Sequence, residues 1–187
     1  YLNVLKDKDA WWFMFFYSVT FGGFVGLASS LTIYFNDQYG MSPVHAGYFT
    51  AASVFAGSLV RPMGGALADR IGGIRTLLVM YSLAALFLVI VSLGMPTAEL
   101  ALLVFILAMV SLGFGNGAVF QLVPQRFRKE IGVMTGLVGM AGGVGGFYLA
   151  ASLGIIKGST GSYQLGFLIF AGLALLGPVR GTFPQRL

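Results

Sequence analysis

An arginine inside an apolar segment is the first feature of this sequence that could do chemistry. Arg61 lies in GSLVRPMGGALADRIGG, residues 57–73, and Asp69 marks the end of the apolar run. At about 1.5 Å per helical residue, Arg61 lies about 12 Å inside that boundary. A charge at such depth costs about 2.5–3.5 kcal/mol on insertion scales, so it usually faces a bundle interior or an aqueous cavity. A snorkelling side chain is the alternative, and the depth favours binding.

The guanidinium of Arg61 predicts an anionic ligand. It stays charged and presents a planar fork that matches two oxygens of a flat oxyanion such as carboxylate, nitrate or nitrite. The acidic residues near the apolar runs map to their ends: Asp37, Asp69, Glu99 and Glu130. We therefore expect Arg61 to lack an internal counterion until an anion binds.

Two aromatic rings and one amide could complete such a site. Tyr17 and Phe21 are four residues apart and share one helix face, beside a glycine-rich stretch. Their rings could sandwich a flat anion while the tyrosine hydroxyl donates to it, and packing of the rings is an equal alternative. Asn116, in GFGNG, could hydrogen-bond the anion or another helix.

A glycine ladder lies in the segment that includes GLVGMAGGVGGFYLAASLG, residues 136–154. Steps of four and three residues leave one helix face without side chains, at Gly132, Gly136, Gly139, Gly143 and Gly146. Each glycine costs about 1 kcal/mol of helix propensity in water, so packing or access must offset it. Two interpretations stay open: close helix packing, and a hinge or backbone wall along a narrow anion path.

The composition indicates that membrane helices position these residues. The chain is 57% hydrophobic and 9% charged, whereas soluble domains are about 25% charged. Runs of about 20 apolar residues, enough to cross a bilayer core, are predicted near 10–35, 43–67, 74–94, 98–121, 131–156 and 163–179. With no Cys, one His and no embedded carboxylate, the sequence lacks the parts for zinc hydrolysis or acid–base catalysis. We expect a non-enzymatic all-α membrane protein without metal or cofactor.

The net charge of +5 is a topology signal rather than a nucleic-acid patch. One set of connections holds only Lys157, so the positive-inside rule places both termini in the cytoplasm, in a multi-pass protein of the cytoplasmic (inner) membrane. Arg61 aside, the remaining basic residues lie in the tails and in the alternate connections: Lys6, Lys8, Arg70, Arg75, Arg126, Arg128, Lys129, Arg180 and Arg186.

The six spans divide into two sets of three, 10–94 and 98–179, and transporter halves are often built from such inverted triplets. The first span of each set carries a glycine-rich stretch at similar depth, TFGGFVG at 20–26 and LGFGNGA at 112–118. We expect each of these helices either to be discontinuous there or to be closely approached by a neighbour.

Several motifs resemble one transporter family. GGALADRIGGIRTLL, residues 64–78, resembles the G-x-x-x-D-R-x-G-x-x-R motif of the major facilitator superfamily. The ladder with AGGVGG resembles the second nitrate signature of the nitrate/nitrite porter family within it. GNGAVFQLVPQRFRK and FYSVTFGGFVG are similar to that family's tenth and seventh helices, so the resemblance covers nearly the whole chain in order. The superfamily motif is matched at Gly65, Asp69, Arg70, Gly72 and Arg75.

The resemblance implies that residues 1–187 form helices seven to twelve, the carboxyl-terminal half of a twelve-helix transporter, and that the amino-terminal half is missing. In that family one arginine from each half grips the anion, and Arg61 matches the carboxyl-terminal one. The expected substrate contacts also include Tyr17, Phe21, Gly139, Gly142 and Gly143. The expected cytoplasmic gate consists of Gly65, Asp69, Arg70 and Arg75.

The expected function is nitrate and nitrite transport by alternating access. The lack of embedded carboxylates favours exchange over proton-coupled uptake, although a proton site could lie in the missing half. Two alternatives are a facilitator for another small anion and a non-transporting membrane subunit that assembles through its glycine face. The expected partners are nitrate, nitrite, membrane lipid and the missing half, with no nucleic acid.

Overall fold

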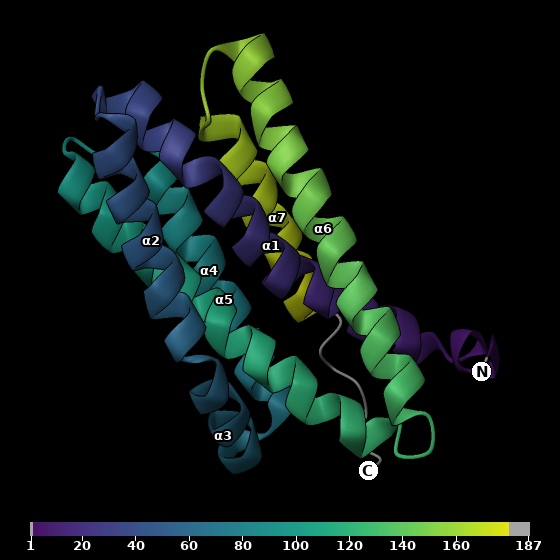
Figure 1. The fold of residues 1–187 in the computed structure, drawn as a ribbon. Helices are drawn as coiled ribbons and strands as arrows, with labels where there is room; N and C mark the ends of the chain where they lie inside the picture. Colours follow the sequence, from purple (N-terminus) through teal and green to yellow (C-terminus); the bar gives the residue numbers. More distant parts are fainter. Residues whose placement is uncertain (1, 180–187) are drawn as a thin grey trace.

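A computed structural model describes residues 2–179 as a bundle of helices (Figure 1). A 3-10 turn, Leu2–Lys6, precedes α1 (Lys8–Tyr39), α2 (Pro43–Leu59), α3 (Arg61–Ile71), α4 (Gly73–Ser92), α5 (Ala98–Arg126), α6 (Ile131–Thr160) and α7 (Gln164–Val179). Helices α1, α4, α5 and α6 are each long and apolar enough to cross a membrane, and α7 is a shorter apolar helix. The predicted all-helical fold is confirmed, and Arg180 and Arg186 lie outside the described residues.

The second predicted span is two helices rather than one. α2 ends at Leu59 and α3 begins at Arg61, with Val60 between them. Pro62 lies in the first turn of α3 and has no backbone N–H to donate to the preceding turn, which interrupts the helical ladder at this point. The chain therefore breaks next to its deep arginine, and α3 is a separate short helix.

The glycine-rich stretches of α1 and α5 are continuous helices. The expectation of a discontinuity is wrong for both, and the expectation of close approach is confirmed. A Cβ atom at Gly22 of α1 would lie 2.7 Å from the backbone of Gly145 in α6. A Cβ atom at Gly113 of α5 would collide with the carbonyl oxygen of Gly57 in α2. These glycines let backbones meet, which is how helices associate without a hydrophobic drive in lipid.

Helices of the first triplet (α1 to α4, residues 10–94) and of the second (α5 to α7, residues 98–179) pack against one another. α1 packs mainly against α6, α5 packs against α2 and α3, and α4 lies against α5 and α7. Figure 1 shows α6 alongside α1, and α3 at the end of the bundle where α5 ends and α6 begins. We call this the basic end, since Arg70, Arg75, Arg128 and Lys129 lie in the segments that turn there.

At the opposite end, Tyr163 joins the start of α7 to α1. Its hydroxyl donates to the carboxylate of Asp37 at 3.0 Å, and the ammonium of Lys157 lies 4.9 Å from the centre of its ring. Burial, followed by the hydrogen bond to Asp37, raises the pKa of the Tyr163 hydroxyl to about 12. The hydroxyl therefore stays protonated and continues to donate at physiological pH.

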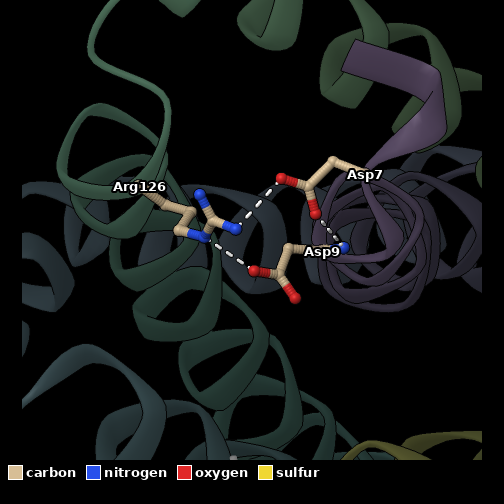
Figure 2. A network of polar contacts seen from close by, with 3 residues as sticks. All are labelled: Asp7, Asp9 and Arg126. Carbon is tan, nitrogen blue, oxygen red and sulfur yellow. Dashed lines mark hydrogen bonds and ion pairs between the residues drawn. The ribbon is translucent and has the colours of Figure 1, made fainter. Parts of the chain in front are cut away.

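At the basic end, Arg126 ties α5 to the start of α1. Figure 2 shows its guanidinium between two carboxylates: Nε donates to Asp9 at 2.6 Å and Nη2 donates to Asp7 at 3.0 Å. The sequence placed Arg126 in a connection between two helices, whereas α5 continues through Pro124 and ends at Arg126. One arginine thus links the first helices of the two triplets.

We expect Arg126→Gln to lower the free energy of unfolding by about 1 kcal/mol, because the three side chains are partly exposed and form a network rather than a buried pair. Thermal unfolding of the purified protein measures this. The loss should shrink at about 1 M salt, where the Debye length is about 3 Å. Arg128→Gln, which removes an exposed neighbouring charge, is the control. Equal unfolding midpoints for the wild type and Arg126→Gln at low salt would contradict the linkage.

Candidate anion site

A cavity of about 640 Å³ lies between α1, α3 and α5. Arg61, Gly65 and Asp69 of α3 recur at four-residue intervals and so share one helix face. All three line the cavity. The opposite wall of the cavity consists of residues of α1 and α5, among them Tyr17, Asn116, Phe120 and Gln121. The structure thus brings the predicted arginine, tyrosine and asparagine to one place.

The guanidinium of Arg61 rests on aromatic rings. Its central carbon lies 4.5 Å from the centre of the Phe24 ring and 5.3 Å from that of Phe21. Its Nε is buried without a hydrogen-bond partner. Within residues 2–179 the structure gives Arg61 no ion pair.

The free-energy cost of burying a guanidinium donor without an acceptor points to a ligand. Cation–π contacts contribute about 0.5–2 kcal/mol. A buried donor without a partner costs about 1–3 kcal/mol, and more when it is charged. The rings therefore hold the guanidinium in place while its Nε stays without an acceptor, and an oxyanion in the cavity would supply one.

The aromatic rings do not form the expected sandwich. Tyr17 and Phe21 stack directly on each other, with ring centres 5.0 Å apart and planes 3° apart. No anion fits between rings at this spacing, so that expectation is wrong. Phe120 meets the Tyr17 ring edge-on at 4.9 Å. Tyr17 lines the cavity, while Phe21 lies beside the guanidinium and supports it.

The glycines of α6 divide into two kinds of position. Gly142 is buried against the stacked pair: a Cβ atom there would lie 2.6 Å from the Tyr17 ring and 2.9 Å from the Phe21 ring. Gly139 and Gly143 are exposed, and an added Cβ would meet nothing within 4 Å. Gly142 thus makes room for the rings, and contact of Gly139, Gly142 and Gly143 with the anion stays a prediction.

Asn116 is the most deeply buried polar residue of the cavity wall. It is 2% exposed, and neither its amide nitrogen nor its amide oxygen has a hydrogen-bond partner. The neighbouring glycines explain the direction in which Asn116 points, because Gly113 and Gly117 face α2 and α3 while Gly115 faces Thr20 of α1. The helix-packing hydrogen bond that the sequence allowed is not formed within the described residues, which favours a ligand.

The superfamily motif contributes unequally to the cavity. Gly65 and Asp69 line it, whereas Arg70 and Arg75 are outside it at the basic end. Sequence reasoning missed Gln121, whose amide nitrogen donates to Asp69 at 2.7 Å. It follows Gly117 by four residues, and this spacing could have placed it on the α3 side of α5.

Comparisons with known proteins point to one family of transporters. A family model described as Major Facilitator Superfamily matches residues 1–150. A nitrite extrusion protein of Bacillus subtilis (strain 168) is 35% identical over 92% of this chain and 43% of its own length. A probable nitrate/nitrite antiporter NarK1 of Thermus thermophilus is 31% identical over 94% of this chain and 44% of its own length. A probable nitrate transporter NarT of Staphylococcus carnosus (strain TM300) is 35% identical over 93% of this chain and 45% of its own length.

The chain spans less than half the length of these curated relatives. It has several apolar helices long enough to cross a membrane, as an integral multi-pass membrane protein requires. Because the family model covers most of its residues, the chain belongs to the Major Facilitator Superfamily.

Proposed function

We propose that this chain is the carboxyl-terminal half of a transporter that moves nitrate and nitrite across the cytoplasmic membrane by alternating access, and that it is not an enzyme. One observation carries the proposal: the guanidinium of Arg61 has a buried, unpartnered Nε and shares a cavity with the unpartnered amide of Asn116. A small flat oxyanion accepts from both donors. The printed names of the relatives point to the same anions.

The arrangement of the helices supports a half-transporter with two inverted repeats. If residues 10–94 and 98–179 are equivalent, α1 corresponds to α5, and α6 corresponds to α2 with α3. The packing of α1 on α6 is then equivalent to the packing of α5 on α2 and α3. Both contacts use glycine-to-backbone approach, at Gly22 in one repeat and at Gly113 in the other.

The missing half is the proposed main partner. The exposed ladder on α6 is rimmed by exposed apolar side chains, including Met140, Val144 and Phe147. A second half that packs there would cover Gly139 and Gly143 and would supply a second cation opposite Arg61. The basic residues at one end support a cytoplasmic location of both termini.

Transport by the full-length protein tests the proposal. We expect liposomes loaded with nitrite and containing the full-length transporter to take up labelled nitrate, and liposomes without internal anion to take up much less, since exchange requires a counter-substrate. External nitrite should compete with nitrate, whereas formate and phosphate should not. Uptake inhibited equally by formate would instead indicate a facilitator for small anions in general.

Asn116→Ala should change stability and binding in opposite directions. Replacing an amide whose two polar atoms are buried and unpaired removes a desolvation penalty of about 1–3 kcal/mol, so the anion-free protein should unfold at a higher temperature. Nitrate affinity should fall about tenfold, because one hydrogen bond to the charged anion is lost. Thermal unfolding with and without nitrate measures both quantities.

Asn116→Leu, which keeps the number of side-chain heavy atoms and removes both polar atoms, is the matched variant. A lower unfolding temperature in both variants, with nitrate affinity unchanged, would assign Asn116 to helix packing instead.

A further inference from the structure

The far end of α3 is held by one side chain of α5. The amide nitrogen of Gln121 donates to Oδ1 of Asp69 at 2.7 Å, across 52 positions of sequence. The amide oxygen of Gln121 is buried without a partner and lies 2.9 Å from the position that a Cβ atom of Gly73 would occupy. Gln121 therefore lies between the end of α3 and the start of α4.

α3 can respond to that contact as one rigid unit. It is an 11-residue helix, separated from α2 by the break at Val60. At its other end Gly72 has φ +94°, a backbone conformation that favours glycine, and α4 starts directly afterwards. With helical continuity interrupted at both ends, the position of α3 depends on its lateral contacts.

Those lateral contacts lie at the two ends of α3. Near its start, Gly64 lies against the backbone of Phe114, and Gly117 lies against the carbonyl oxygen of Arg61. Near its end, the hydrogen bond from Gln121 to Asp69 fixes the helix against α5. Because Arg61 is the first residue of α3, a shift of the far end changes the direction of its guanidinium in the cavity.

The hydrogen bond from Gln121 also fixes the place of the negatively charged Asp69 carboxylate. Asp69 lines the cavity that contains Arg61, two helical turns and about 12 Å along the helix axis. An anion that approaches Arg61 from the basic end meets this carboxylate first. The amide donor of Gln121 holds the carboxylate at the α5 wall.

We propose that Gln121 is a positioning residue for anion transport: it donates to Asp69, fixes the end of the helix that begins with Arg61, and links the cavity to the turn between α3 and α4. The assignment to transport rests on the proposed function. The positional part rests only on the geometry of α3 and α5.

The proposal can be tested in the full-length transporter by exchanging the amide of Gln121 and the carboxylate of Asp69. Gln121→Glu cannot donate to Asp69 and places two carboxylates together, so nitrate exchange should fall by about tenfold or more. Adding Asp69→Asn restores one donor and one acceptor, since the amide of residue 69 now donates to the carboxylate of residue 121. The double variant should exchange nitrate at least about threefold faster than Gln121→Glu alone. A double variant no faster than Gln121→Glu alone would overturn the proposal.

A second readout does not depend on the substrate. The described chain has no Cys, so Ala66→Cys places a single reactive thiol in this half, at the cavity wall. Its maleimide labelling rate should change by about threefold or more with Gln121→Glu and return to the starting rate in the double variant. Equal labelling rates in all three backgrounds would overturn the positioning role.

Gln121→Met keeps the length of the side chain, removes the donor and adds no charge, so it applies if Gln121→Glu does not fold. It should also change the labelling rate, and an unchanged rate would overturn the proposal. If the wild type fails to exchange nitrate while the labelling pattern appears as described, the proposed function fails and the role of Gln121 in placing α3 stands.

Discussion

Arg61→Ala in the full-length transporter is expected to lower nitrate affinity about a hundredfold, equivalent to about 3 kcal/mol, because removing one partner of a desolvated charge pair costs about 2–5 kcal/mol. Arg61→Lys should lower affinity about tenfold, since an ammonium keeps the charge and loses the planar fork that binds two oxygens. Nitrate titration of the purified protein, followed by uptake into liposomes, measures both effects.

The stability of the same variants separates binding from folding. The side chain of Arg61 makes no hydrogen bond or ion pair within residues 2–179, and its Nε is buried without a partner. Arg61→Ala should therefore leave the unfolding temperature of the anion-free protein unchanged or raise it. Arg128→Ala removes an equal charge at the exposed basic end and serves as the control for net charge. Unaltered nitrate uptake in Arg61→Ala would show that the anion binds elsewhere.

Gly117→Val is expected to abolish nitrate binding and to lower the free energy of unfolding by about 1–3 kcal/mol or more, the usual cost of overpacking. A Cβ atom at this position would collide with the carbonyl oxygen of Arg61 and lie 2.7 Å from the backbone nitrogen of Gly65. Both obstacles are backbone, so no side-chain rotation relieves them. α3 has to move away from α5, and Arg61 moves with it.

Two further glycine variants make this prediction specific. Gly115→Ala meets the Thr20 side chain at 2.7 Å instead of backbone, so its loss of stability should be smaller. Gly172→Ala meets no atom within 4 Å in the described chain and should behave as the wild type. Thermal unfolding and nitrate titration of the three variants rank their losses of stability and of nitrate binding. Similar losses at Gly117 and Gly172 would show that helix flexibility, rather than close approach, explains the glycines of α5.

The approximate limits of the helices followed from the sequence, apart from the division of the second segment into α2 and α3, because the length of an apolar run and the spacing of charges at its ends are local properties. The same reasoning found Arg61, since its depth depends only on its distance along one helix from Asp69. For the glycine-rich stretches of α1 and α5 it predicted either a break or a close approach. It could not choose between close approach and a break, because the choice depends on which helix lies opposite.

Tertiary structure decided how the residues of the site meet. Helical periodicity tells which side chains share a face, but not what that face contacts. The stacking of Tyr17 on Phe21, the open space around Gly139, and the bond between Gln121 and Asp69 are such contacts. The break before Arg61 depends on sequence and tertiary structure together. Pro62 removes a backbone donor, and the close approach of Gly117 holds α3 against α5.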